Sequence, residues 1–188
     1  SPMLRREFTL VNPVERARLY VTSRGLYEVE LNGRRVGDEV LTPGWTSYGK
    51  RIQYQTYDVT AQLQKGKNAV GVALGNGWYR GNLAWSDRRN LYGERLAVLA
   101  QIVVTYRGGK QEVIGTDAAW KAATGPVLMS EIYHGETYDA RLEKAGWSAP
   151  GFADAGWTSV KVADYPKDNL VAPAGPPVRR IEEVKPVK

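Results

Sequence analysis

The feature that most restricts the fold is the two-residue alternation of apolar and polar side chains, which recurs along the chain while helical periodicity is almost absent. Residues 18–23 and 26–31 alternate in this way, and the dipeptide Asn32-Gly33 that follows is typical of a hairpin turn. Residues 50–59 also alternate, whereas residues 68–74 are nearly all apolar, as in a central strand covered on both faces. The pattern predicts a protein built from short strands.

The second half of the chain continues this pattern. Residues 96–106 are the longest candidate strand, and a glycine-containing turn at 107–110 joins them to a short partner at 111–114. Only one short helical turn is expected, at residues 58–63. Many short strands, glycine-rich turns and very little helix are typical of a β-sandwich or jelly roll, so we expect an all-β fold.

Composition excludes several classes of protein. The 188 residues suffice for one domain with its own core, and 43% hydrophobic residues are too many for a disordered chain. No apolar run approaches the ~20 residues of a membrane span. The chain has no cysteine and one histidine, His134, which excludes disulfides, thiolate metal sites and two-histidine metal motifs. The net charge of +6 comes from scattered basic residues without a basic run, so we expect no nucleic-acid partner.

Composition also predicts the organisation of the chain. Residues 164–188 contain five of the ten prolines and have no sustained strand period. We expect an N-terminal arm or first strand over residues 1–16, a β-sandwich over residues 17–163 and an extended linker over residues 164–188. A linker at this position suggests that the sandwich is one domain of a larger protein.

Five segments in the same order carry a family resemblance. They are ARLYVTSRGLYEVELNGRRVGDEVLTPGWTSYGKRIQYQTYDVT at 17–60, GNGWYRG at 75–81, NLYGERLAVLAQI at 90–102, IYHGETYDARLEKAGW at 132–147 and PPVRRIEEVKPV at 176–187. Together they resemble the N-terminal domain of bacterial α-L-rhamnosidases of glycoside hydrolase family 78. The stretch at 57–74 alone is less specific, because galactose-binding-like domains of other glycoside hydrolases carry a similar one, which leaves such a domain as an alternative.

The resemblance implies a galactose-binding-like sandwich that precedes the catalytic barrel of an enzyme removing terminal L-rhamnose. In that family the catalytic acids lie in the barrel, so we expect no catalytic residue in this chain, no required cofactor, and the catalytic domain of the same chain as its partner. Export or a periplasmic location in a bacterium is also implied. Acidic residues near aromatic ones have no spacing distinctive of a glycosidase pair: Asp87, Glu94, Glu131, Glu136 and Asp139.

Two long loops are expected, at 76–95 and at about 124–139, and the first is the candidate binding site. It combines aromatic faces, which stack on sugar rings, with amide, carboxylate and arginine groups that bind hydroxyls. The candidate sugar-binding residues are Trp78, Arg80, Trp85, Asp87, Asn90 and Tyr92. Asp87 and Asn90 also offer the oxygen ligands that calcium prefers. Because some members of the family bind L-rhamnose through calcium, the alternative function is a calcium-assisted module for rhamnose-containing glycans.

The same loop has two other interpretations. Trp78 with Tyr79 would close the end of the sandwich, or the loop would contact the catalytic domain. Four further tryptophans are expected to pack against sheets or to cap the sandwich: Trp45, Trp120, Trp147 and Trp157. We assign no chemistry to His134, because a lone loop histidine is more often a hydrogen-bonded surface residue.

Overall fold

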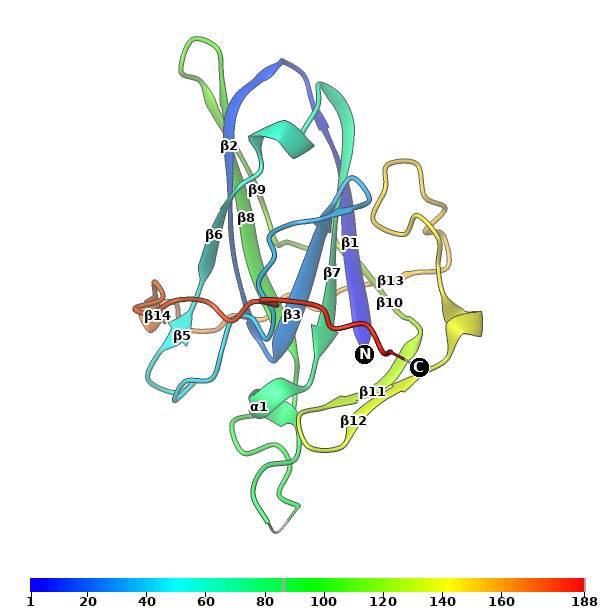
Figure 1. The fold of residues 1–188 in the computed structure, drawn as a ribbon. Helices are drawn as coiled ribbons and strands as arrows, with labels where there is room; N and C mark the ends of the chain where they lie inside the picture. The colour runs from blue at the N-terminus through cyan, green and yellow to red at the C-terminus, as the bar shows by residue number, and fades with distance from the viewer. Residues whose placement is uncertain (86, 188) are drawn as a thin grey trace.

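The computed structural model describes residues 1–85 and 87–187, and strands make up most of its regular structure (Figure 1). The strands are β1 (Pro2–Leu10), β2 (Val14–Arg24), β3 (Leu26–Leu31), β4 (Arg34–Arg35), β5 (Ile52–Gln53), β6 (Gln55–Asp58), β7 (Gly66–Gly75), β8 (Ala97–Tyr106), β9 (Gln111–Gly115), β10 (Lys121–Thr124), β11 (Val127–Glu131), β12 (Gly135–Tyr138), β13 (Thr158–Ser159) and β14 (Leu170–Val171). One α-helical turn, α1 (Gly77–Arg80), and 3₁₀ turns at Thr60–Gln62 and Ala140–Leu142 complete the described structure.

Two antiparallel sheets form a sandwich. One has the strand order β13-β10-β1-β7-β3-β4 and the other β6-β2-β8-β9. Figure 1 shows β2 and β8 running alongside β3, β7 and β1 on the long axis of the molecule. The predicted all-β sandwich with very little helix is confirmed. No helix within the described ranges is long and apolar enough to cross a membrane.

The core lies between the two sheets. Inward-facing residues of β2 and β8 meet those of β3 and β7 in one cluster whose largest fully buried members include Leu19, Val21, Ile102, Val29, Leu31, Val70 and Val72. Alternation along each strand places every second side chain in this layer, which explains the pattern of the sequence. Burial of each such side chain contributes roughly 1.5–3 kcal/mol to folding.

Local signals and tertiary contacts both shape the strands. The turn after β3 is the predicted one, with φ of 53° at Asn32 and 77° at Gly33. The single strand expected at 50–59 is divided at Tyr54, where the amide donates to Val171 O and β14 pairs in parallel with β5. The long loop expected at 124–139 is largely the hairpin of β11 and β12. Both differences arise from pairings with segments that the local pattern does not show.

The two ends of the chain both contact the sandwich. Within residues 1–16, β1 lies inside the larger sheet, between β10 and β7. Beyond residue 163 the chain is extended, and β-pairing joins it to the sandwich at two points. The first is β14 on β5, and the second is an antiparallel bridge between Glu39 and Arg179, whose guanidinium lies 2.7 Å from Asp38 Oδ1. These contacts fix the course of the terminal segment.

A buried arginine fastens the loop 139–157 to the larger sheet. Arg5, on β1, is 1% exposed, and its guanidinium donates to Trp147 O (2.9 Å) and Ala149 O (3.2 Å) and forms an ion pair with Asp154. The Trp147 ring stacks on Trp157 at 6.3 Å and lies against β7, where a Cβ on Gly71 would overlap it. The predicted packing against a sheet is therefore confirmed for Trp147, and Trp157 packs on the Trp147 ring.

The pKa of Asp154 makes this attachment sensitive to acid. A hydrogen bond from Lys121 lowers the pKa below its ordinary value of 3.8; burial opposes this shift, and the charge of Arg5 adds to it. Because the native pKa is depressed, the carboxylate stabilises the fold above about pH 4, and that contribution is lost as the pH falls through the native pKa.

We therefore expect D154N to unfold more easily at pH 7, by about 1–3 kcal/mol. The difference between D154N and the wild-type chain should shrink below about pH 4 and then vanish. Urea unfolding at a series of pH values, followed by tryptophan fluorescence, measures this difference. A difference in the free energy of unfolding between the two proteins that stays constant down to pH 2 would contradict the prediction.

Candidate functional site

The candidate site lies at one end of the sandwich, where the loop after β4, the loop 76–95 and the hairpin of β11 and β12 meet (Figure 1). The loop 76–95 begins with α1, a single turn that leads directly out of β7. Gly77 starts this turn at φ 53°, and a Cβ there would overlap Leu26, so only glycine fits without displacement. The loop then folds back on α1, since the amide of Asn90 donates to Arg80 O and that of Tyr92 to Tyr79 O.

Five aromatic rings gather at this end. Trp45 and Trp78 are stacked, with centroids 5.8 Å apart and planes 4° from parallel, and Trp45 Nε1 donates to Tyr92 Oη at 3.2 Å. Beneath them Tyr48 packs edge-on against Tyr92 (4.9 Å) and Tyr79 (5.2 Å). Tyr48 and Tyr79 are buried, whereas Trp45 is 54% and Tyr92 36% exposed. A buried tyrosine base thus carries an accessible aromatic surface, formed by Trp45, Trp78 and Tyr92.

The environment of Tyr48 is consistent with a structural role. Burial, followed by the nearby phenols of Tyr92 and Tyr79, raises its pKa above the ordinary value of 10. The Tyr48 hydroxyl donates to Gly44 O at 3.2 Å, which holds the loop that carries Trp45. The ring therefore stays a neutral phenol at physiological pH and supports the aromatic surface.

A buried carboxylate holds the loop 76–95 to the hairpin. Glu131, at the end of β11, has a side chain only 1% exposed. Its Oε1 accepts from Asn76 Nδ2 (2.8 Å) and Arg89 Nη2 (2.7 Å), and its Oε2 accepts from the backbone amide of Asn82 (2.9 Å). A Cβ on Gly81 would overlap Glu131 Oε2, so glycine lets the loop approach this closely. The carboxylate therefore holds the loop at two places, near its start at Asn76 and Asn82 and near its end at Arg89.

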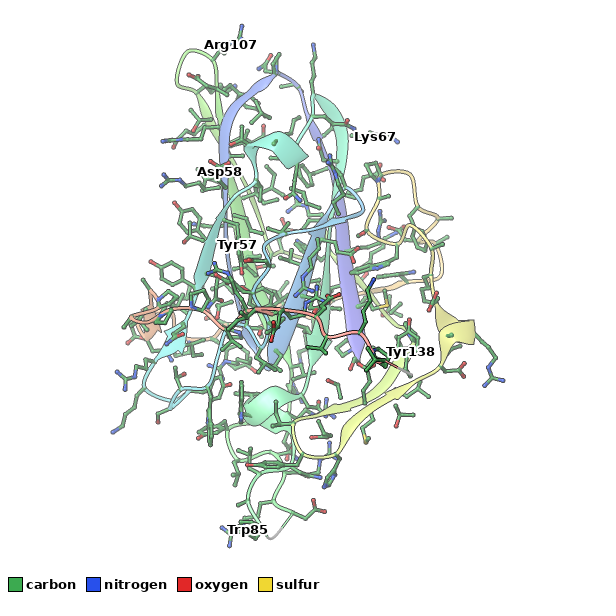
Figure 2. The ribbon with its side chains drawn as sticks, viewed as in Figure 1. Tyr57, Asp58, Lys67, Trp85, Arg107 and Tyr138 are labelled. Atoms are coloured by element: carbon green, nitrogen blue, oxygen red, sulfur yellow. The ribbon has the colours of Figure 1, made fainter. Side chains whose placement is uncertain are left out.

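The tip of the loop is separate from the aromatic surface. Trp85 is fully exposed and points away from the body of the domain (Figure 2). Asp87, at φ 52°, lies with Oδ1 3.6 Å from His134 Nε2, while His134 Nδ1 is 3.0 Å from Asn82 Nδ2. The histidine therefore joins the loop tip to the turn of the hairpin.

The predicted site residues thus fall into three groups. Trp78 and Tyr92 belong to the aromatic surface, Arg80 and Asn90 are joined by a backbone hydrogen bond on the inner part of the loop, and Trp85 and Asp87 lie at its tip. Across the ranges 1–85 and 87–187 no cluster of three or more His, Asp or Glu side chains could hold a metal ion. Calcium binding by Asp87 and Asn90 stays a prediction.

Two residues of this end were not identified as site residues from the sequence. Trp45 is expected to pack against a sheet or to cap the sandwich, and the structure leaves half of it exposed beside Trp78. Its position in the polar segment Gly44 to Lys50 was the available signal, since a tryptophan among small and polar residues is a candidate for the surface. Glu131 gave no comparable signal, because its burial depends on Asn76, Asn82 and Arg89.

Comparison with known proteins gives one family. Residues 12–182 match the family described as the α-L-rhamnosidase N-terminal domain. An α-L-rhamnosidase of Streptomyces avermitilis is 49% identical over 183 residues, which cover 96% of this chain and 18% of the relative.

Solved structures agree with this assignment. The crystal structure of native α-L-rhamnosidase from Aspergillus terreus superposes with a TM-score of 0.95 at 47% identity, over 96% of this chain and 21% of that one. The crystal structure of Streptomyces avermitilis α-L-rhamnosidase complexed with L-rhamnose gives a TM-score of 0.91 at 48% identity, over 97% of this chain and 18% of that one. The chain spans about a fifth of the length of these relatives. It belongs to the α-L-rhamnosidase N-terminal domain family.

Proposed function

We propose that this chain is the non-catalytic β-sandwich domain of an α-L-rhamnosidase that hydrolyses terminal L-rhamnose from glycosides, and that it packs on and orients the catalytic domain of the same polypeptide. The observation that carries the proposal is the match over residues 12–182 to an N-terminal domain, in relatives of which about four-fifths lies outside the match.

The hydrogen bonds of two of the candidate acids, Glu131 and Asp139, support this proposal. Glycoside hydrolysis needs two carboxyl groups that flank the scissile bond. Both oxygens of Glu131 accept hydrogen bonds inside the protein, and Asp139 is held by Arg141 through its Nε (2.8 Å) and Nη2 (2.7 Å). These acids are occupied in positioning loops, which leaves them unsuited to proton transfer at a sugar.

A nitrophenyl α-L-rhamnoside tests the proposal. We expect no turnover by residues 1–188 and turnover by a polypeptide that joins this chain to a catalytic barrel. Removal of residues 1–188 from that longer polypeptide should lower its melting temperature, because the barrel loses a packed neighbour. Turnover by residues 1–188 alone would overturn the assignment.

The aromatic surface favours a second candidate function, a carbohydrate-binding module for rhamnose-containing glycans. Trp45, Trp78 and Tyr92 present rings of the kind that stack on the C–H faces of sugars. The hydrogen bond from Trp45 Nε1 to Tyr92 Oη fixes the position of two of these rings relative to each other. In this candidate function Arg80, Trp85, Asp87 and Asn90 supply further contacts, with calcium bound by Asp87 and Asn90.

We expect W45A to weaken the binding of L-rhamnose at least about tenfold, which corresponds to about 1.4 kcal/mol, because one face of the stack is removed. Calorimetry with and without calcium and a chelator measures this change. Y138A, which removes another half-exposed ring on the hairpin, is the matched control and should bind as the wild-type chain does. Equal affinity of W45A and wild type would exclude the aromatic surface as the sugar site, and affinity unchanged by the chelator would exclude the calcium.

A further inference from the structure

A cavity of about 650 Å³ lies behind the aromatic surface, and neither proposed function uses it. Its walls include the ends of β2 and β7, the starts of β1 and β8, and the segment 159–167. The volume falls within the range of about 300–1,000 Å³ that is typical of small-molecule sites. Tyr79, the buried ring beneath Trp78, accepts a hydrogen bond from Arg24 in the cavity wall, so the cavity and the aromatic surface lie back to back.

Most of the cavity wall is apolar. Leu4, Leu96, Val98 and Val160 pack against the core on one side but stay only partly buried, because their other side faces the cavity. Trp120 adds a buried ring to the same wall. Such a lining recognises a ligand with a hydrocarbon body.

The cation Arg24, in this wall, has no counter-ion among the residues that the structure describes. Arg24, at the end of β2, is half-buried, with its guanidinium 3.6 Å from the centroid of the Tyr165 ring and one nitrogen donating to Tyr79 Oη at 3.2 Å. No carboxylate of residues 1–85 or 87–187 comes within ion-pair distance of it. An arginine that is stacked on an aromatic ring and lines an apolar cavity is suited to bind a planar carboxylate.

Most of the charged residues that line the cavity are basic. Arg95, Lys161 and Lys167 also line the cavity, against the two acids Asp117 and Asp164. Asp117 is already paired with Arg6 at 2.8 Å. The cavity therefore combines apolar walls with a positive rim.

We propose that this cavity binds an organic carboxylate with a mainly apolar body. The carboxylate pairs with Arg24, and the apolar body lies against Leu96, Val98 and Val160. The site is distinct from the aromatic surface and from the chemistry of rhamnose, which carries no charge.

Two probes of the same shape test the charge requirement: naphthalene-2-carboxylate and the neutral naphthalene-2-methanol. In calorimetry on residues 1–188 the carboxylate should bind at one site per chain, at least about tenfold more tightly than the alcohol, and more weakly as salt is raised. R24Q should lose this preference by weakening the carboxylate about tenfold while leaving the alcohol unchanged. R34Q, which removes an exposed arginine on β4, is the control and should match the wild-type chain.

A second pair of variants tests the place of binding. V98F fills the cavity and should abolish binding of both probes, whereas V103F puts the same side chain on the outer face of β8 and should not. W45A should leave carboxylate binding intact, which separates this site from stacking on the aromatic surface. If V98F fails to fold, the comparison of R24Q with R34Q tests the proposed carboxylate site in its place. Equal affinity for both probes, no effect of R24Q, loss of binding in W45A, or no saturable binding to the folded chain would overturn the proposal.

Discussion

Replacing Arg5 with methionine is expected to lower the free energy of unfolding by about 3–5 kcal/mol, because one partner of a buried ion pair is removed while the other stays. Methionine fills much the same space, but it removes the hydrogen bonds that Arg5 donates to Trp147 O and Ala149 O and its ion pair with Asp154, which keeps only Lys121 as a partner. Urea unfolding followed by tryptophan fluorescence measures the change, since Trp147 and Trp157 lie in the loop that Arg5 holds.

R34M provides the matched control. Arg34 is an exposed arginine in another strand of the same sheet, so its replacement should change the free energy of unfolding by no more than about 0.5 kcal/mol. A loss of less than 1 kcal/mol in R5M would show that the loop 139–157 is held by its aromatic packing alone.

The sandwich could be predicted from the sequence because its signals are local. The patterns at residues 18–23, 26–31 and 68–74 lie within β2, β3 and β7, and the pattern at 96–106 coincides with β8 to within one residue. Each strand buries every second side chain or, in the centre of a sheet, nearly all of them, so neighbouring residues carry the information. The Asn32-Gly33 turn could also be predicted from the sequence, because positive φ at two successive residues restricts the choice of side chain.

The attachments between loops and sheets could not be predicted in this way. In the sequence, Arg5 occupies an ordinary polar position of an alternating strand. Its burial depends on a loop more than 140 residues away in the chain. Trp45 and Trp78 come from different loops, and only the closed sandwich brings their rings together. Such residues are specified by contacts distant in sequence, for which one chain offers no periodic signal.

Replacing Glu131 with glutamine is expected to weaken the attachment of the loop 76–95 by about 1.5–3 kcal/mol, the contribution of hydrogen bonds to a charged group. Three donors point at the carboxylate, from Asn76, Asn82 and Arg89, and a glutamine amide would turn an NH₂ group towards one of them. Hydrogen exchange of the Asn82 amide, which is buried and donates to Glu131 Oε2, should become about ten- to a hundredfold faster.

E136Q is the control for this change, because Glu136 lies on the same hairpin with its side chain exposed. Unchanged exchange at Asn82 in E131Q would contradict the anchoring role. E131Q also separates an effect on the loop from an effect on the stability of the whole domain. Trp78 and Tyr92 lie on the loop that Glu131 holds, whereas the core lies between the two sheets. If E131Q loses affinity for L-rhamnose while amides in β2 and β8 exchange as slowly as in the wild-type chain, the sugar must bind to the loop in the conformation that Glu131 maintains.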